Sequence, residues 1–116
     1  MMNNCMFVGR LVSDPEVKEL EGGQKVSNIT LAIQRSYKNS EGEYETDFVD
    51  CTLWQGVAET TSEYCKKGDM IGIRGRIETS VYENDKGEKN KRTQVVADKV
   101  SFLSAVKIKE AEPDMA

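Results

Sequence analysis

The sequence predicts an all-β fold with one short helix. Several short runs rich in β-branched residues alternate with clusters of Gly, Asn, Asp and charge, a pattern typical of a barrel or sandwich of strands. One stretch instead follows helical spacing. Because 116 residues suffice for one compact core, we expect one domain over residues 1–104 and a short polar, flexible tail over residues 105–116.

The first two predicted strands are bounded by turn signals. The first covers residues 5–11 and is closed by the Ser-Asp-Pro turn at 13–15. The second covers residues 26–37, after a Glu-Gly-Gly turn at 21–23, and precedes a polar loop at 38–45. Alternation places three aliphatic residues of this strand on one face: Ile29, Leu31 and Ile33.

The third predicted strand, residues 46–54, alternates most clearly. One face carries Val49, Cys51 and Leu53, and the other carries Phe48, Asp50, Thr52 and Trp54. A helix over residues 57–65 follows, with a buried stripe of either Val57, Thr61 and Tyr64 or Ala58, Thr61 and Cys65. Lys66, Lys67 and Gly68 supply the signals that end a helix.

The last two predicted strands form a hairpin over residues 70–82 and 92–103, with its tip at 84–89. In the first of them we expect Ile71, Ile73, Ile77 and Val81 to point inward and Arg74, Arg76, Glu78, Ser80 and Tyr82 outward. Gly72 and Gly75 within it indicate a bulge or a close backbone approach. A helix between the third and fourth of five strands is the layout of an OB-fold five-stranded barrel.

Composition narrows the function classes. No histidine is present, which removes the commonest general base, and no nucleophile motif or phosphate-binding glycine loop occurs, so we do not expect an enzyme. Three widely spaced cysteines without histidine favour reduced structural thiols, with no metal and no cofactor. No leader or membrane-spanning run is visible, which predicts a cytoplasmic protein without membrane contact. The net charge of −4 counts against nucleic-acid binding.

Aromatic residues nevertheless occupy the polar side of the predicted strands. Phe48, Trp54 and Tyr82 lie on the face opposite the aliphatic stripe of their own strand, and Tyr37 ends the second strand. Several outward aromatics on neighbouring strands suggest a platform on which unpaired bases stack. A second hydrophobic layer, covered by the helix or by another subunit, is the alternative.

Basic residues accompany these aromatics. Arg74 and Arg76 share the outward face with Tyr82, and further basic side chains gather at strand ends and at the hairpin: Arg35, Lys38, Lys86, Lys89, Lys91 and Arg92. A solvated rim explains any single lysine equally well. Asp50 and Glu78 on the same face would repel phosphate, so we expect stacking to supply a larger share of the affinity than phosphate contacts.

The sequence also resembles the bacterial and phage single-stranded DNA-binding protein family over residues 3–104. Individually weak motifs occur in the order and spacing of that family, at residues 7–11, 14–16, 26–32, 48–54, 58–59, 62–64, 67–68 and 75–77. The resemblance implies an OB fold that assembles as a homotetramer, or as a dimer, and coats single-stranded DNA during replication, repair, recombination or uptake. It also implies stacking by Tyr37, Phe48, Trp54 and Tyr82, and phosphate contacts by Arg10, Arg35, Lys66, Lys67 and Arg76.

The chain departs from that family after residue 104. Cellular members carry a long linker and an acidic tip with a hydrophobic last residue, whereas this sequence ends in Glu-Ala-Glu-Pro-Asp-Met-Ala at 110–116. Recruitment of repair proteins through the tail is therefore doubtful, and a phage, plasmid-borne or competence-associated short form is expected. Two other functions remain open, an OB module that binds RNA or oligosaccharide and a protein-assembly domain whose aromatic face is an interface.

Overall fold

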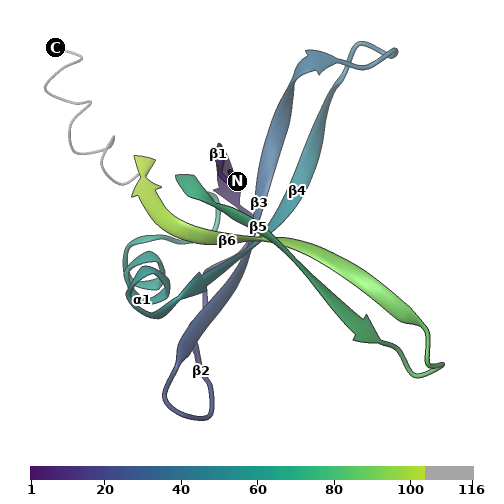
Figure 1. Cartoon of the computed structure of the whole chain (residues 1–116). Helices are drawn as coiled ribbons and strands as arrows, with labels where there is room; N and C mark the ends of the chain where they lie inside the picture. The colour runs from purple at the N-terminus through teal and green to yellow at the C-terminus, as the bar shows by residue number, and fades with distance from the viewer. Residues whose placement is uncertain (104–116) are drawn as a thin grey trace, which may run out of the picture.

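The computed structural model describes residues 1–103, so the expected tail at 105–116 lies outside the described residues. Within these described residues, six strands and the helix α1 follow one another (Figure 1). Their bounds are β1 Cys5–Leu11, β2 Lys18–Glu19, β3 Lys25–Lys38, β4 Tyr44–Trp54, α1 Gln55–Tyr64, β5 Met70–Glu83 and β6 Lys89–Phe102. The sequence predicted every strand except β2, which spans only two residues.

Five strands close into a barrel. The sheet runs β1-β5-β6-β4-β3, and a second pairing of β1 with β3 joins its two ends. The β4–β6 pair is parallel, whereas the other pairs are antiparallel. Closure brings the strands so near that a Cβ on Gly9 of β1 would lie 2.9 Å from Ile33 Cγ1. The predicted fold class, an all-β OB barrel with one short helix, is confirmed for the described residues.

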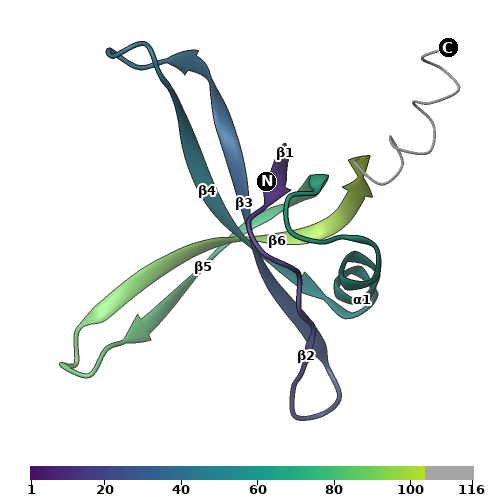
Figure 2. The same cartoon turned by 180° about the vertical axis from the view of Figure 1, so that it is seen from behind.

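The barrel interior holds the core, and α1 packs against it beside β6 (Figure 2). Of the two helical stripes predicted, the buried one is Ala58, Thr61 and Cys65. The strand residues of the core cluster come from alternate positions, as expected where one face of a sheet is covered. They are Leu11, Ile29, Leu31, Cys51, Leu53, Ile71, Ile73, Val95 and Ala97.

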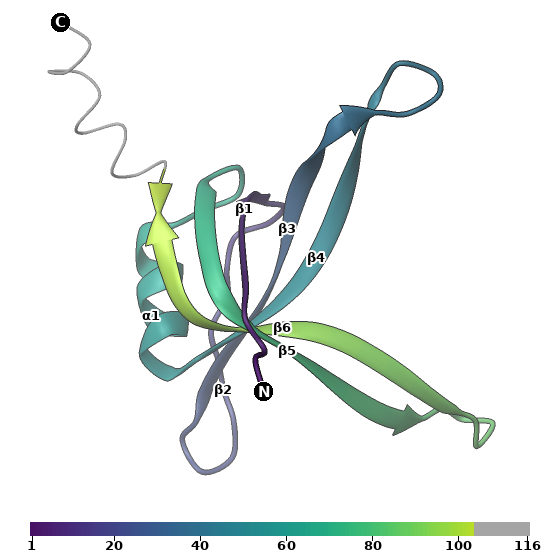
Figure 3. The same cartoon turned by 45° about the horizontal axis from the view of Figure 1, so that its top comes forward.

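Two hairpins extend beyond the barrel. The distal parts of β3–β4 and of β5–β6 project in different directions as two-stranded arms (Figures 1 and 3). The prediction that Ile77 and Val81 point into the core is therefore wrong, because β5 has left the barrel there, and their side chains are 47% and 64% exposed. Alternation identifies the face of a strand but not the point where the strand leaves the barrel.

The two arms end in matching turns. In each turn the side-chain oxygen of an asparagine, Asn39 or Asn84, accepts hydrogen bonds from two backbone amides at 2.9–3.0 Å. A glycine three residues later, Gly42 or Gly87, has a positive φ of 81° or 78°. Only glycine adopts this conformation without strain, so the repeated Asn-x-x-Gly spacing fixes both tips.

A register shift interrupts the β5–β6 ladder next to Gly75. Arg74 pairs with Lys99 and Gly75 pairs with Ala97, which leaves Asp98 as an extra residue on β6. A Cβ on Gly75 would lie 2.1 Å from the Val96 carbonyl oxygen, so only glycine fits there. This confirms the close approach predicted for Gly75, whereas a Cβ on Gly72 would make ordinary contacts from 3.6 Å outward.

Candidate nucleic-acid interface

The strand register places most of the predicted aromatics on one outer face. Thr52 of β4 pairs with Val96 of β6, and Val96 pairs with Arg76 of β5, so these three side chains share a face. Alternation along β4 adds Phe48 and Trp54 to that face, and alternation along β5 adds Glu78 and Tyr82. We call this surface of β3, β4, β5 and β6 the aromatic face.

Side-chain contacts confirm that the aromatic face is continuous across strands. Thr52 Oγ1 lies 3.2 Å from both Asn28 Oδ1 on β3 and Gln94 Oε1 on β6. Arg92 Nη2 of β6 lies 3.8 Å from Asp50 Oδ2 of β4. These contacts link the outer face of β4, which carries Phe48 and Trp54, to the outer face of β6, and β6 pairs with β5, which carries Tyr82.

The four predicted stacking residues are open to solvent. Their exposed fractions are 63% for Tyr37, 67% for Phe48, 38% for Trp54 and 52% for Tyr82. The helix therefore does not cover them, which removes one form of the second-layer alternative. A subunit interface remains the other form.

Trp54 stands where the chain turns from β4 into α1. Trp54 itself is extended, with φ −118°, and the next residue, Gln55, has a positive φ of 53°. A non-glycine residue in this region is uncommon and costs energy, so the sharp turn after Trp54 is held by its surroundings. The Gln55 side chain accepts a hydrogen bond from Lys25 N at 3.4 Å.

Tyr44 is an aromatic residue that falls within the predicted loop at 38–45. The structure extends β4 to Tyr44 and pairs it with Lys38 on the arm. The Lys38 ammonium nitrogen lies 5.7 Å from the centroid of the Tyr44 ring, within the range of a cation–π contact. The Asn-x-x-Gly spacing before Tyr44 is the sequence signal that could have shortened the predicted loop.

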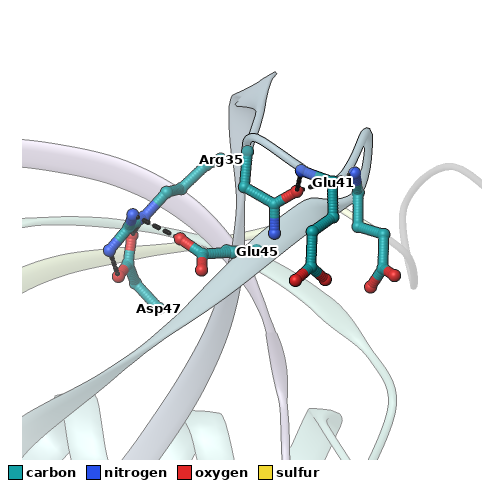
Figure 4. A network of polar contacts seen from close by, with 6 residues as sticks. Arg35, Glu41, Glu45 and Asp47 are labelled. Carbon is teal, nitrogen blue, oxygen red and sulfur yellow. Dashed lines mark hydrogen bonds and ion pairs between the residues drawn. The ribbon is translucent and has the colours of Figure 1, made fainter.

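Arg35 lies on the opposite side of the β3–β4 arm from Phe48. Its guanidinium donates to both Asp47 oxygens at 2.9 and 3.0 Å and to Glu45 at 2.7 Å (Figure 4). Asp47 pairs with Ile33, so this cluster continues the inward face of the barrel. The hydrogen bond from Arg35 lowers the pKa of Asp47. Arg35 thus ties the two strands of the arm together.

Arg76 lies on the aromatic face but is held by two carboxylates. Its Nε lies 2.9 Å from Glu78 Oε2, and its Nη1 lies 2.8 Å from Asp98 Oδ1. Asp50 also has local partners, since it accepts a hydrogen bond from Thr30 Oγ1 at 2.8 Å and faces Arg92. The acidic residues expected to oppose phosphate are thus paired with arginines of the same face.

Three basic residues, Arg10, Lys66 and Lys67, lie near the end of β1. Arg10 pairs with Ala32, which pairs with Phe48, so Arg10 extends the outer face across three strands. Its Nη1 donates to the Gly68 carbonyl at 3.1 Å, next to Lys66 and Lys67. The backbone of that loop is anchored, because Lys67 N donates to Asp14 at 2.7 Å.

Arg74 precedes Arg76 by two residues on β5, so alternation puts it on the same side of that strand, across the register shift from Arg76. It pairs with Met6 of β1 and lines a hollow of about 400 Å³ with Met6, Val8, Lys99 and Leu103. The structure therefore brings Arg76, Phe48, Trp54 and Tyr82 onto one face. Arg74 lies on the side of β5 that carries Arg76, in the part of the strand that pairs with β1, whereas Arg35 lies on the opposite side of the β3–β4 arm.

The described residues offer no other chemistry of note. Burial raises the pKa of the Cys51 thiol to about 12 and that of Cys65 to about 11, so both stay protonated and unreactive at neutral pH. Residues 1–103 contain no cluster of side chains suited to a metal ion. Within the same range, no helix has the length and apolar character needed to cross a membrane.

Comparison with known proteins gives one consistent result. The model of the "Single-strand binding protein family" matches residues 2–103. The chain is 48% identical over 103 residues to single-stranded DNA-binding protein B of Bacillus subtilis, covering 89% of this chain and 91% of that protein. It is 45% identical to single-stranded DNA-binding protein 1 of Lactococcus lactis, in an alignment that covers 92% of this chain and 71% of that protein. It is 43% identical to the single-stranded DNA-binding protein of Halalkalibacterium halodurans, in an alignment that covers 89% of this chain and 61% of that protein.

Proposed function

Because this chain belongs to the single-strand binding protein family, we propose that it binds single-stranded DNA without catalysing a reaction. The observation that carries the mechanism is the aromatic face, which presents Phe48, Trp54 and Tyr82 to solvent on one side of the sheet. Every base has a π-face, so stacking on these rings holds unpaired bases largely independently of sequence. We propose that Tyr37, which is 63% exposed near the end of β3, adds a further ring on the β3–β4 arm.

Basic side chains supply the phosphate contacts in this proposal. Arg10, Lys66 and Lys67 form a group whose side chains are exposed beside the outer face. Arg76 lies within the aromatic face, Arg74 lies two residues before it on the same side of β5, and Arg35 lies on the opposite side of the β3–β4 arm. The DNA backbone is expected to run from the β1 end of the barrel across β4 toward the β5–β6 arm.

The biological setting is the cytoplasm, where single-stranded DNA arises in replication, recombination, repair and uptake. We infer that residues 1–104 form the binding domain. We do not propose that residues 105–116 recruit repair proteins.

Fluorescence of Trp54, the only tryptophan in the chain, provides the test. Stacking of a base on the indole is expected to quench its emission when oligo(dT) is added. The logarithm of the binding constant should fall against the logarithm of salt concentration with a slope of about −0.7 per phosphate contact. Absence of quenching and of binding at low salt would refute single-strand binding. An RNA oligomer that outcompetes DNA of the same sequence would favour the RNA-binding alternative.

We also propose that copies of the chain assemble, as a homotetramer or as a dimer. Two observations support assembly. Met6 and Val8 of β1 are 77% and 48% exposed, and residues Cys5–Gly9 pair with β5 but, within residues 1–103, with no strand on their other edge. An apolar edge strand of this kind is a template for pairing with another chain.

A further inference from the structure

Three acidic residues occupy the surface that is proposed to receive DNA. Asp50, Glu78 and Asp98 all contact arginines there, at 2.8–3.8 Å. We propose that Glu78 and Asp98 act as built-in counterions of Arg76, which compete with a DNA phosphate for the Arg76 donors and so limit the affinity for single-stranded DNA. This inference rests on the proposed function and adds the residues that set its strength.

The geometry around Arg76 leaves little room for a phosphate. A guanidinium carries five N–H donors in a fixed plane, and it binds phosphate best through two neighbouring donors. In Arg76, Nε donates to Glu78 and Nη1 donates to Asp98. A phosphate that binds Arg76 through Nε and Nη2 must therefore replace Glu78, and one that binds through Nη1 and Nη2 must share Nη1 with Asp98.

Each acid has a structural reason for its position. Glu78 follows Arg76 by two residues on β5, so alternation puts both side chains on the same face. Asp98 is the extra residue created by the register shift opposite Gly75, and the shift directs its side chain toward Arg76. The bulge thereby adds a negative charge to the DNA-binding surface.

Arg92 and Asp50 form a further pair of an arginine and a carboxylate on this surface, at a longer distance than the pairs of Arg76. Its closest N···O distance is 3.8 Å, and Asp50 is also anchored by Thr30 Oγ1. The two ion-paired groups together hold two arginines and three carboxylates, so these groups themselves carry no net positive charge. Displacement of a carboxylate by phosphate exchanges one ion pair for another, so little is gained from Arg76 on binding.

The test is a titration of oligo(dT) against Glu78→Gln, with Asp98→Asn as a second variant. Removing one counterion frees Arg76, so we expect binding about two- to five-fold tighter than in the wild type, the scale of an exposed ion pair. The salt slope should become steeper, by up to about 0.7 for one added phosphate contact.

Glu83→Gln is the matched control. Glu83 lies on the same strand but on the opposite face of the arm, so it changes the net charge equally without touching Arg76. Equal gains in Glu78→Gln and Glu83→Gln would overturn the inference, because they would reflect overall charge alone. Weaker binding by Glu78→Gln would also overturn it, since Glu78 would then position Arg76 for DNA.

A double variant separates the route through Arg76 from direct repulsion. If Glu78 acts by holding Arg76, the gain from Glu78→Gln should disappear when Arg76 is replaced by Gln. A gain that persists without Arg76 would refute the counterion role. Failure of the wild-type chain to bind oligo(dT) would instead refute the proposed function, so the two failures are distinct.

Discussion

At the scale of single residues, the aromatic rings and the arginines of the outer face differ in how freely they can meet DNA. Phe48 and Tyr82 have more than half of their surface exposed. Arg76 and Arg92 are engaged by carboxylates of the same face. Stacking requires no bond within the protein to be broken, whereas a phosphate contact through Nε of Arg76 requires its hydrogen bond to Glu78 to be broken. The rings are therefore expected to provide most of the binding energy.

Replacing Phe48 by alanine tests this expectation. Loss of one stacked base should weaken oligo(dT) binding by roughly 1–3 kcal/mol, which is about 5- to 150-fold. Trp54 remains in this variant, so fluorescence quenching still reports the affinity. Val81→Ala removes an exposed apolar side chain from the opposite face of the β5–β6 arm and should leave binding unchanged. Wild-type affinity in Phe48→Ala would show that this ring does not stack on a base.

At the scale of elements, the register shift in β5–β6 depends on Gly75. Its Cα approaches the Val96 carbonyl so closely that an added methyl group has no space. The neighbouring atoms are backbone, which cannot rotate away as a flexible side chain would. A substitution here must move β6 relative to β5, and with it Asp98.

Gly75→Ala is accordingly expected to lower the free energy of unfolding by about 1–3 kcal/mol, the usual range for overpacking. Gly56→Ala is the control, because no atom lies within 4 Å of the added Cβ and the residue is in α1. Alanine favours helix over glycine, so this variant should gain up to about 1 kcal/mol. Urea denaturation followed by circular dichroism measures both. A Gly75→Ala chain as stable as the wild type would contradict the close approach.

The outward position of Phe48 and the inward positions of Ile29 and Leu31 could be predicted from alternation, because one face of β3 and β4 is buried or half-buried where these strands belong to the barrel. Ile77 and Val81 were misplaced because the same alternation continues where β5 has left the barrel. The partners of Arg76 could not be predicted, since Asp98 reaches it only through the shift in register. Ion pairs between distant residues depend on registers that local patterns do not reveal.

At the scale of the whole molecule, β1 differs from the other long strands. Its end, Arg10–Leu11, closes the barrel against β3, whereas Cys5–Gly9 has β5 on one side. Met6 and Val8 are exposed on the same stretch. Apolar exposure beside unpaired backbone groups is unfavourable in an isolated chain, and a second copy would remove both costs at once.

Introducing charge into this stretch tests assembly. The variant Met6→Asp/Val8→Asp should lower the particle mass measured by light scattering toward the 13.0 kDa of one chain. Desolvation of two carboxylates would oppose burial in an interface. Val81→Asp, an equivalent change on the β5–β6 arm, should leave the mass unchanged. A double variant with the mass of the wild type would exclude β1 as the contact between copies.

Barrel closure also constrains the order of events during synthesis. Phe7 of β1 pairs with Ile73 of β5, and Leu11 pairs with Leu31 of β3. The β3–β4 hairpin can form as soon as it leaves the ribosome, since its strands are joined by a tight turn. β1 must wait for β5, and such non-local pairing is slow. Until β5 emerges, the nascent chain keeps the inner face of β1 exposed, which is the interval in which a chaperone would protect it.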